Sequence, residues 1–169
     1  MILREAIRDL YLHMEWADAI VWKSVLASEA ASSDPKTREL LYHIHIVQRA
    51  FHQLWSGSRV DVPEPSAFAT AEAIRQWARG NHAELRSFLE RLDEEHLDRP
   101  LKIPWAKRLT ERFGITPQSV TQGESMFQVP AHSTYHRGQV NARLREQGAE
   151  PPLIDYIAWL WFGRPEAEW

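Results

Sequence analysis

Apolar residues recur at three- and four-residue steps through four long stretches of the chain, which is the spacing of amphipathic helices. Clusters of Gly, Pro, Ser and Asp separate these stretches and act as helix starts and stops. Almost no segment alternates apolar and polar residues in the way that strands do. The predicted helices span residues 2 to about 30, about 35 to 56, about 70 to 92, and from 116–119 to about 147.

The connections between the predicted helices differ in length. Ser33 or Asp34 caps the second helix. Residues 57–69 are long enough to cross one end of a bundle, so the second and third helices need not be antiparallel neighbours. Residues 93–117 contain several Pro and Gly and one expected short helix, Ala106 to Phe113. Such a segment either covers a functional site or forms a surface excursion, here one pinned by Trp105 and Phe113.

A fifth, short helix is expected from Leu153 to Phe162, and residues 163–169 should be irregular. We therefore predict one all-α domain over residues 1–169, a four-helix bundle with a short C-terminal helix. The length allows a single substantial core.

The fourth predicted helix carries the strongest candidate chemistry. His132 and His136 lie one turn apart on one face, a spacing that lets two imidazoles bind the same metal ion. Gln139 follows one turn later and could hydrogen-bond to a ligand. Pro130 removes a backbone hydrogen bond just before His132, so we expect a kink there.

A firm site needs a further ligand, and the second helix offers His43, His45 and His52. On a helical wheel His43 lies nearest the apolar side of that helix, His52 next and His45 farthest. His43 is therefore predicted to point between helices. Of the other candidates, Arg137 should be solvated or ion-paired, and Gly138 should permit close helix packing.

Composition removes several function classes. The chain has no Cys, so disulfides, thiolate metal sites and Cys nucleophiles are excluded, and any metal must be held by His, Asp or Glu. The net charge of −3 comes with scattered Lys and Arg, which argues against a nucleic-acid partner. No apolar run approaches a membrane span and no signal peptide is evident, so a cytoplasmic protein is expected.

The letters around the histidines resemble a known family. The stretch His132-Ser133-Thr134-Tyr135-His136-Arg137-Gly138-Gln139, followed by Leu144-Arg145-Glu146-Gln147-Gly148, is similar to the C-terminal signature of the DinB/YfiT-like superfamily. Leu40-Leu41-Tyr42-His43-Ile44 resembles the second helix of that family, and Trp16-Ala17-Asp18 its first. One departure is Gln48, where the family often has Glu.

The resemblance implies an up-down-down-up four-helix bundle, often a homodimer, that binds a divalent metal, commonly zinc or nickel. The implied ligands are His43, His132 and His136. Known members include transferases that use bacillithiol or mycothiol and a mycothiol-dependent isomerase. The implied partners are thus a small-molecule substrate and a low-molecular-weight thiol.

Three neutral imidazoles leave open positions on a metal, as catalytic sites do. The leading hypothesis is a metal-dependent transferase that adds a low-molecular-weight thiol to an electrophilic small molecule. The alternatives are a metal-dependent hydrolase and a non-catalytic metal- or small-molecule-binding stress protein. His13 and Glu15 are candidate general bases. Trp159, Trp161 and Trp169 are expected to be exposed and could form a homodimer interface.

Overall fold

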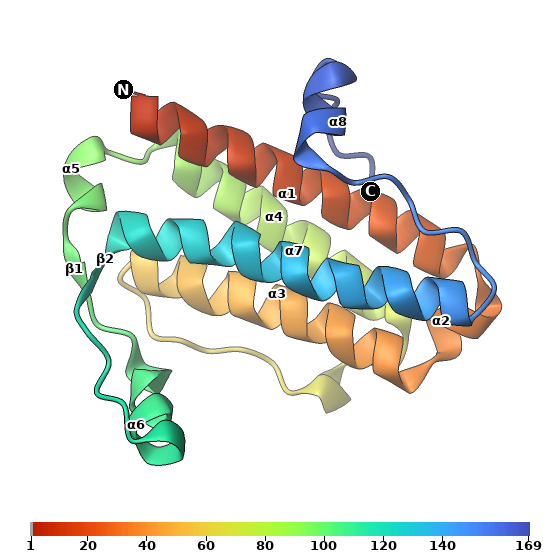
Figure 1. The fold of residues 1–169 in the computed structure, drawn as a ribbon, viewed down its shortest axis with the longest axis horizontal. Coiled ribbons are helices and arrows are strands. Elements are labelled where there is room, and N and C mark those ends of the chain that lie inside the picture. Colours follow the sequence, from red (N-terminus) through yellow and green to blue (C-terminus); the bar gives the residue numbers. More distant parts are fainter. Residues whose placement is uncertain (1) are drawn as a thin grey trace.

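The computed structural model describes residues 2–169, and four long helices form its body (Figure 1). The helices α1 and α7 run in one direction, and α3 and α4 run in the opposite direction. The helix α7 packs between α1 and α3, and α4 packs against the same two helices from the other side. The predicted up-down-down-up bundle is confirmed. The long helices are α1 (Ile2–Leu26), α3 (Pro35–Trp55), α4 (Ala71–Glu90) and α7 (Gln122–Glu146).

Three predicted helix boundaries are wrong, and one of them is the start of the short C-terminal helix, which lies at Tyr156 and not at Leu153. The first helix ends at Leu26, because the Ser28 side chain accepts a hydrogen bond from the Ala31 amide and starts a separate short helix, α2 (Glu29–Ser33). The fourth helix begins only at Gln122. There the Thr121 and Glu124 side chains each accept a hydrogen bond from the other residue's backbone N–H, which makes a capping box.

The segment between α4 and α7 makes a small lobe beside the bundle (Figure 1). Its two short strands pair antiparallel, with Pro100 opposite Thr121. Trp105 packs edge-on against Phe51 of α3, whereas Phe113 is largely exposed, so of the two predicted anchors Trp105 alone holds the segment against the bundle. The elements here are α5 (Glu94–Leu97), β1 (Pro100–Leu101), η2 (Pro104–Ala106), α6 (Lys107–Phe113) and β2 (Val120–Thr121). The remaining short elements are η1 (Pro65–Ala67) and α8 (Tyr156–Trp161).

Of the eight Trp residues, Trp16, Trp22 and Trp55 are buried in the interior of the bundle. Trp159 is also buried, contrary to prediction, because α8 folds back onto α1 and its indole donates to the carbonyl of Pro165. Trp161 is exposed, as predicted. None of the helices in residues 2–169 is both long and apolar enough to cross a membrane.

Pro130 lies inside α7 without ending it. A proline has no N–H, so the carbonyl of Met126, four residues earlier, loses its helical donor. The buried Tyr11 hydroxyl of α1 donates to this oxygen at 2.9 Å. The helix therefore continues through Pro130, and α1 supplies the missing hydrogen bond.

This arrangement predicts a coupling between Tyr11 and Pro130. Replacing Tyr11 with Phe should destabilise the protein by about 1–3 kcal/mol, because it leaves the Met126 carbonyl buried and unpaired. In a Pro130→Ala background the new backbone N–H at this position supplies a donor, so Tyr11→Phe should cost clearly less. Denaturant unfolding of the two single variants and the double variant measures this coupling. Equal costs in both backgrounds would contradict it.

Asp34 joins the start of α3 to α7. Its carboxylate accepts from the Thr37 backbone N–H and hydroxyl, both at 2.8 Å, and from Arg143 at 2.9 Å. The Arg143 hydrogen bond, with those from Thr37, lowers the pKa of Asp34 to about 2. Because this folded-state pKa lies below the unfolded value of about 4, the stabilisation is present above that unfolded value and is lost as the pH falls toward the folded one.

Replacing Asp34 with Ala should therefore cost about 1–2 kcal/mol near neutral pH. The difference from the unaltered protein should shrink on acidification, as measured by denaturant midpoints across that range. Asp155→Ala is the matched control, since Asp155 also precedes a helix but its side chain makes no capping bond. A pH-independent cost at Asp34 would refute the assignment.

Candidate metal centre

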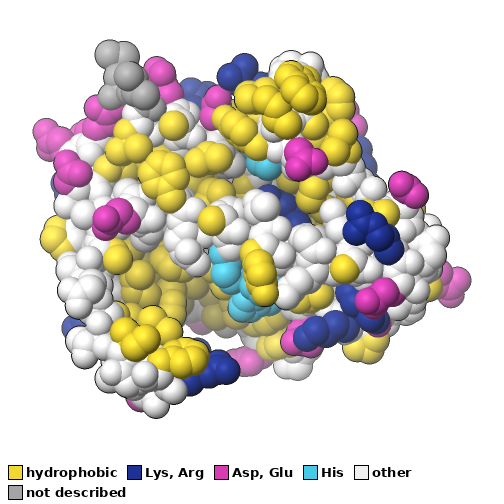
Figure 2. Space-filling model, in the orientation of Figure 1, with side chains coloured by type: hydrophobic (Ala, Val, Ile, Leu, Met, Phe, Trp, Pro, Cys, Tyr) yellow, Lys and Arg dark blue, Asp and Glu magenta, His cyan; other side chains and the backbone are white. Residues whose placement is uncertain are grey.

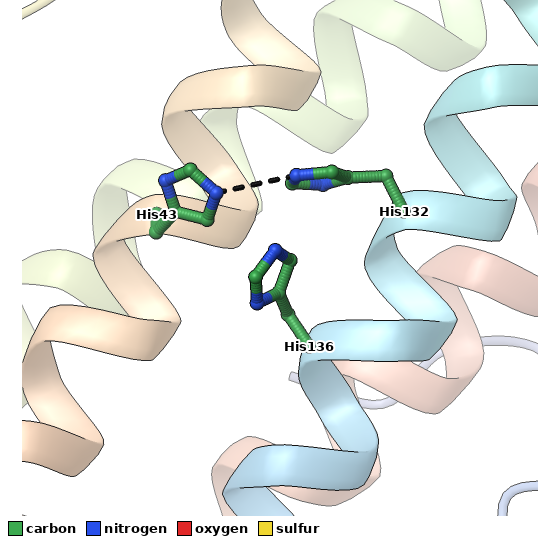
Figure 3. Close-up of side chains that lie close together, drawn as sticks. All are labelled: His43, His132 and His136. Atoms are coloured by element: carbon green, nitrogen blue, oxygen red, sulfur yellow. Dashed lines mark hydrogen bonds between the residues drawn. The ribbon is translucent and has the colours of Figure 1, made fainter. Parts of the chain in front are cut away.

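The structure brings the three predicted histidines together in the groove between α3 and α7 (Figure 3). His132 and His136 extend from successive turns of α7, and His43 faces them from α3. The ring centroids are 4.4 Å apart for His132 and His136, 4.5 Å for His43 and His136, and 5.0 Å for His43 and His132. The predicted kink at Pro130 does not separate the two α7 histidines.

The ring nitrogens of these residues point at one another (Figure 3). The Nε2 atoms of His43 and His132 lie 3.2 Å apart. Gln139 Oε1 lies 2.7 Å from His136 Nδ1 and can only accept, so that nitrogen carries the proton and Nε2 keeps its lone pair. The sequence suggested this role for Gln139, and the contact is present.

Two of these imidazoles, those of His43 and His132, favour the neutral state. Burial, together with the nearby His136 and His43, lowers the pKa of His132 to about 4. Burial, followed by the charge on His136, lowers the pKa of His43. Neutral imidazoles offer lone pairs to a metal ion, so the chemistry of this donor set fits a divalent cation. Nδ1 of His132 is buried and has no hydrogen-bond partner within residues 2–169.

The three histidines are partly exposed, and histidine side chains reach the surface of the face shown in Figure 2. His43 and His136 line an open groove of about 630 Å³. Its charged walls are internally paired, with Lys36 bonded to Glu39 and Arg143 bonded to Asp34. A small molecule could therefore approach the histidines from solvent without meeting an unpaired charge among these walls.

A second group of possible metal ligands lies fully inside the bundle. Asp18 of α1, His45 of α3 and His82 of α4 place one ligand atom each within 4.8 Å of the others, as the first three histidines also do. Each of the two groups could hold a metal ion. On a helical wheel His45 lies farthest from the apolar side of its helix, yet His45 is completely buried.

The atoms that could coordinate a metal in this buried group already take part in hydrogen bonds. His45 Nδ1 donates to Gln48 Oε1 at 2.8 Å, and His45 Nε2 accepts from the Trp22 indole at 2.9 Å. Asp18 accepts from His82 at 3.0 Å and from the Arg137 guanidinium at 2.8 Å. A cation here would displace these bonds and approach a buried positive charge, whereas in the first group it would displace the hydrogen bond between the Nε2 atoms of His43 and His132.

The buried network also positions the first group. Gln48 donates to Asp18 and to Ser133, which follows His132 in α7. Arg137, which follows His136, is ion-paired as predicted, but it is buried rather than solvated. These bonds link α1, α3, α4 and α7, so they set the rotation of α7 about its axis and hence the direction of its histidines.

The two candidate general bases, His13 and Glu15, lie away from the three histidines. His13 Nε2 donates to the Ile154 carbonyl at 2.9 Å, and Glu15 accepts from Arg86 and from the Trp169 indole. Neither residue lines the groove beside the histidines. The structure therefore does not bring His13 or Glu15 to the three-histidine group.

Comparisons with known proteins agree with this architecture. The chain is 25% identical over 174 aligned residues to Protein DinB of Bacillus subtilis (strain 168), and the alignment covers 93% of this chain and 95% of that protein. A model of the DinB family matches residues 9–167, nearly the whole chain. The chain belongs to the DinB family.

Proposed function

We propose that this protein is a metal-dependent transferase that joins a low-molecular-weight thiol to an electrophilic small molecule. The observation that carries the proposal is the convergence of three imidazoles, those of His43, His132 and His136, beside a groove open to solvent. A divalent ion such as zinc or nickel, when bound there, would lower the pKa of a coordinated thiol.

The chain's own residues have distinct roles in this proposal. The three histidines would hold the ion, and Gln139 keeps Nε2 of His136 free to coordinate by accepting a hydrogen bond from the N–H at Nδ1. The paired charges of the groove walls leave the entrance close to neutral. Because the chain contains no Cys, the sulfur nucleophile must arrive on a cosubstrate.

Conjugation of monochlorobimane tests this function. In the expected reaction the thiol loses its proton, a carbon–sulfur bond forms and chloride leaves, giving a fluorescent thioether. The zinc- or nickel-loaded protein should accelerate the reaction of bacillithiol, mycothiol or cysteine, and His136→Ala should not. Hydrolysis of p-nitrophenyl acetate without thiol would indicate a hydrolase instead. Activity on neither substrate would favour the non-catalytic binding protein.

A further inference from the structure

A cavity of about 930 Å³ lies on the other flank of α7, between α1 and the chain that leads into α8. It shares no lining residue with the groove beside the histidines. Leu10, Phe127 and Tyr156 are among its apolar walls. Figure 2 shows apolar side chains gathered over α8 on this face. The volume falls within the range of small-molecule sites.

The cavity has polar groups without partners. Arg137 is only 1% exposed, and two of its nitrogens donate to Asp18 and Thr134. Its Nε has no hydrogen-bond partner within the described residues. One turn later in α7, the buried Oδ1 of Asn141 likewise has no partner in residues 2–169. Unpaired buried groups of this kind destabilise the folded state, and a ligand that hydrogen-bonds to them can relieve that cost.

Gly138 keeps the cavity open between these two residues. A Cβ built at Gly138 would meet no atom within 4 Å, so this glycine does not permit close helix packing, contrary to the sequence prediction. It lines the cavity between Arg137 and Asn141. A larger side chain here would project into the cavity and not into a neighbouring helix.

We propose that this cavity binds a small molecule with an apolar body and a terminal carbonyl or carboxylate oxygen. The apolar body packs against Phe127 and Tyr156, and the oxygen accepts a hydrogen bond from the Arg137 guanidinium edge. Oδ1 of Asn141 is an acceptor, so it takes a second hydrogen bond where the same end group also carries an N–H, as a carboxamide does. A cationic end group has no acceptor for Arg137 and is repelled by its charge.

Three probes share an apolar naphthalene body and differ only in their polar end group, so they identify which end group the cavity binds. They are naphthaleneacetamide, naphthaleneacetate and naphthylmethylamine. Titration by heteronuclear NMR should show saturable shifts around Phe127, Gly138 and Asn141 for the amide, the carboxylate or both, and none for the amine. Amide binding identifies a neutral carbonyl ligand, and carboxylate binding alone identifies an anion. Equal binding of the amine, or no saturable binding of either acceptor probe, would overturn the proposal.

Two glycine variants test whether the probe binds in this cavity. Gly138→Leu fills the space and should weaken binding about tenfold or more, as overpacking by several carbon atoms does elsewhere. Gly80→Leu is the matched control, because Gly80 lies in α4, where a Cβ also meets nothing within 4 Å. Unchanged affinity in Gly138→Leu, or shifts centred on His43 and His136, would place the probe elsewhere and refute the cavity site.

Discussion

Replacing Asp18 with Ala should destabilise the fold by about 3–5 kcal/mol, because it leaves the Arg137 guanidinium buried and uncompensated. The two side chains are 2% and 1% exposed. The same change removes the acceptor used by His82 and Gln48. Denaturant unfolding at neutral pH measures the loss.

A double variant separates the effect of the buried Arg137 charge on stability from the effect of the lost hydrogen bonds. Asp18→Leu combined with Arg137→Met removes the leftover charge, so the double variant should cost less than the sum of the two single variants. Glu168→Ala, which breaks the exposed pair with Lys23, is the control and should leave stability almost unchanged. Additive costs in the double variant would show that the buried charge is not the cause.

The pH dependence at Asp18 has a defined sign. Burial alone would raise the pKa of this carboxyl, but Arg137 and the hydrogen bond from His82 hold it well below its usual range. The stabilisation is therefore present above the unfolded pKa of about 4 and is lost as the pH falls through the folded value. The Asp18→Ala variant should lack this acid-dependent component.

Removing one of the three groove histidines, His43, His132 or His136, should have the second large effect. His136→Ala leaves two imidazoles, and we expect it to abolish stable metal binding, since a firm site needs at least three protein ligands. Gln139→Leu should weaken metal binding about 10–100-fold by releasing the His136 ring. Competition with a chromogenic chelator measures both. Gln139→Leu binding as tightly as the unaltered protein would show that the Gln139 contact has no part in the site.

The local features were largely readable from the sequence. The spacing of His132 and His136, and the apolar face beside His43, predicted three side chains that the fold does bring together. Thr121 and Glu124 have the spacing of a capping box, and this local signal places the start of the last long helix at Gln122, later than predicted.

Local sequence patterns could not predict the long-range contacts. A helical wheel assumes one apolar side, but α3 packs against both α4 and α7, so a polar residue such as His45 can be fully buried if its hydrogen bonds are met. The donor for the Met126 carbonyl comes from Tyr11, far away in sequence. Pairing of β1 with β2 depends likewise on residues distant along the chain.

Metal content tests most directly whether His43, His132 and His136 form the metal site. Protein loaded with zinc or nickel, desalted and analysed by elemental mass spectrometry should retain a single bound ion. The His43→Ala and His136→Ala variants should retain none, and His52→Ala, a control on the same helix as His43, should retain it. Unchanged metal content in both ligand variants would contradict the account and direct attention to the buried group of Asp18, His45 and His82.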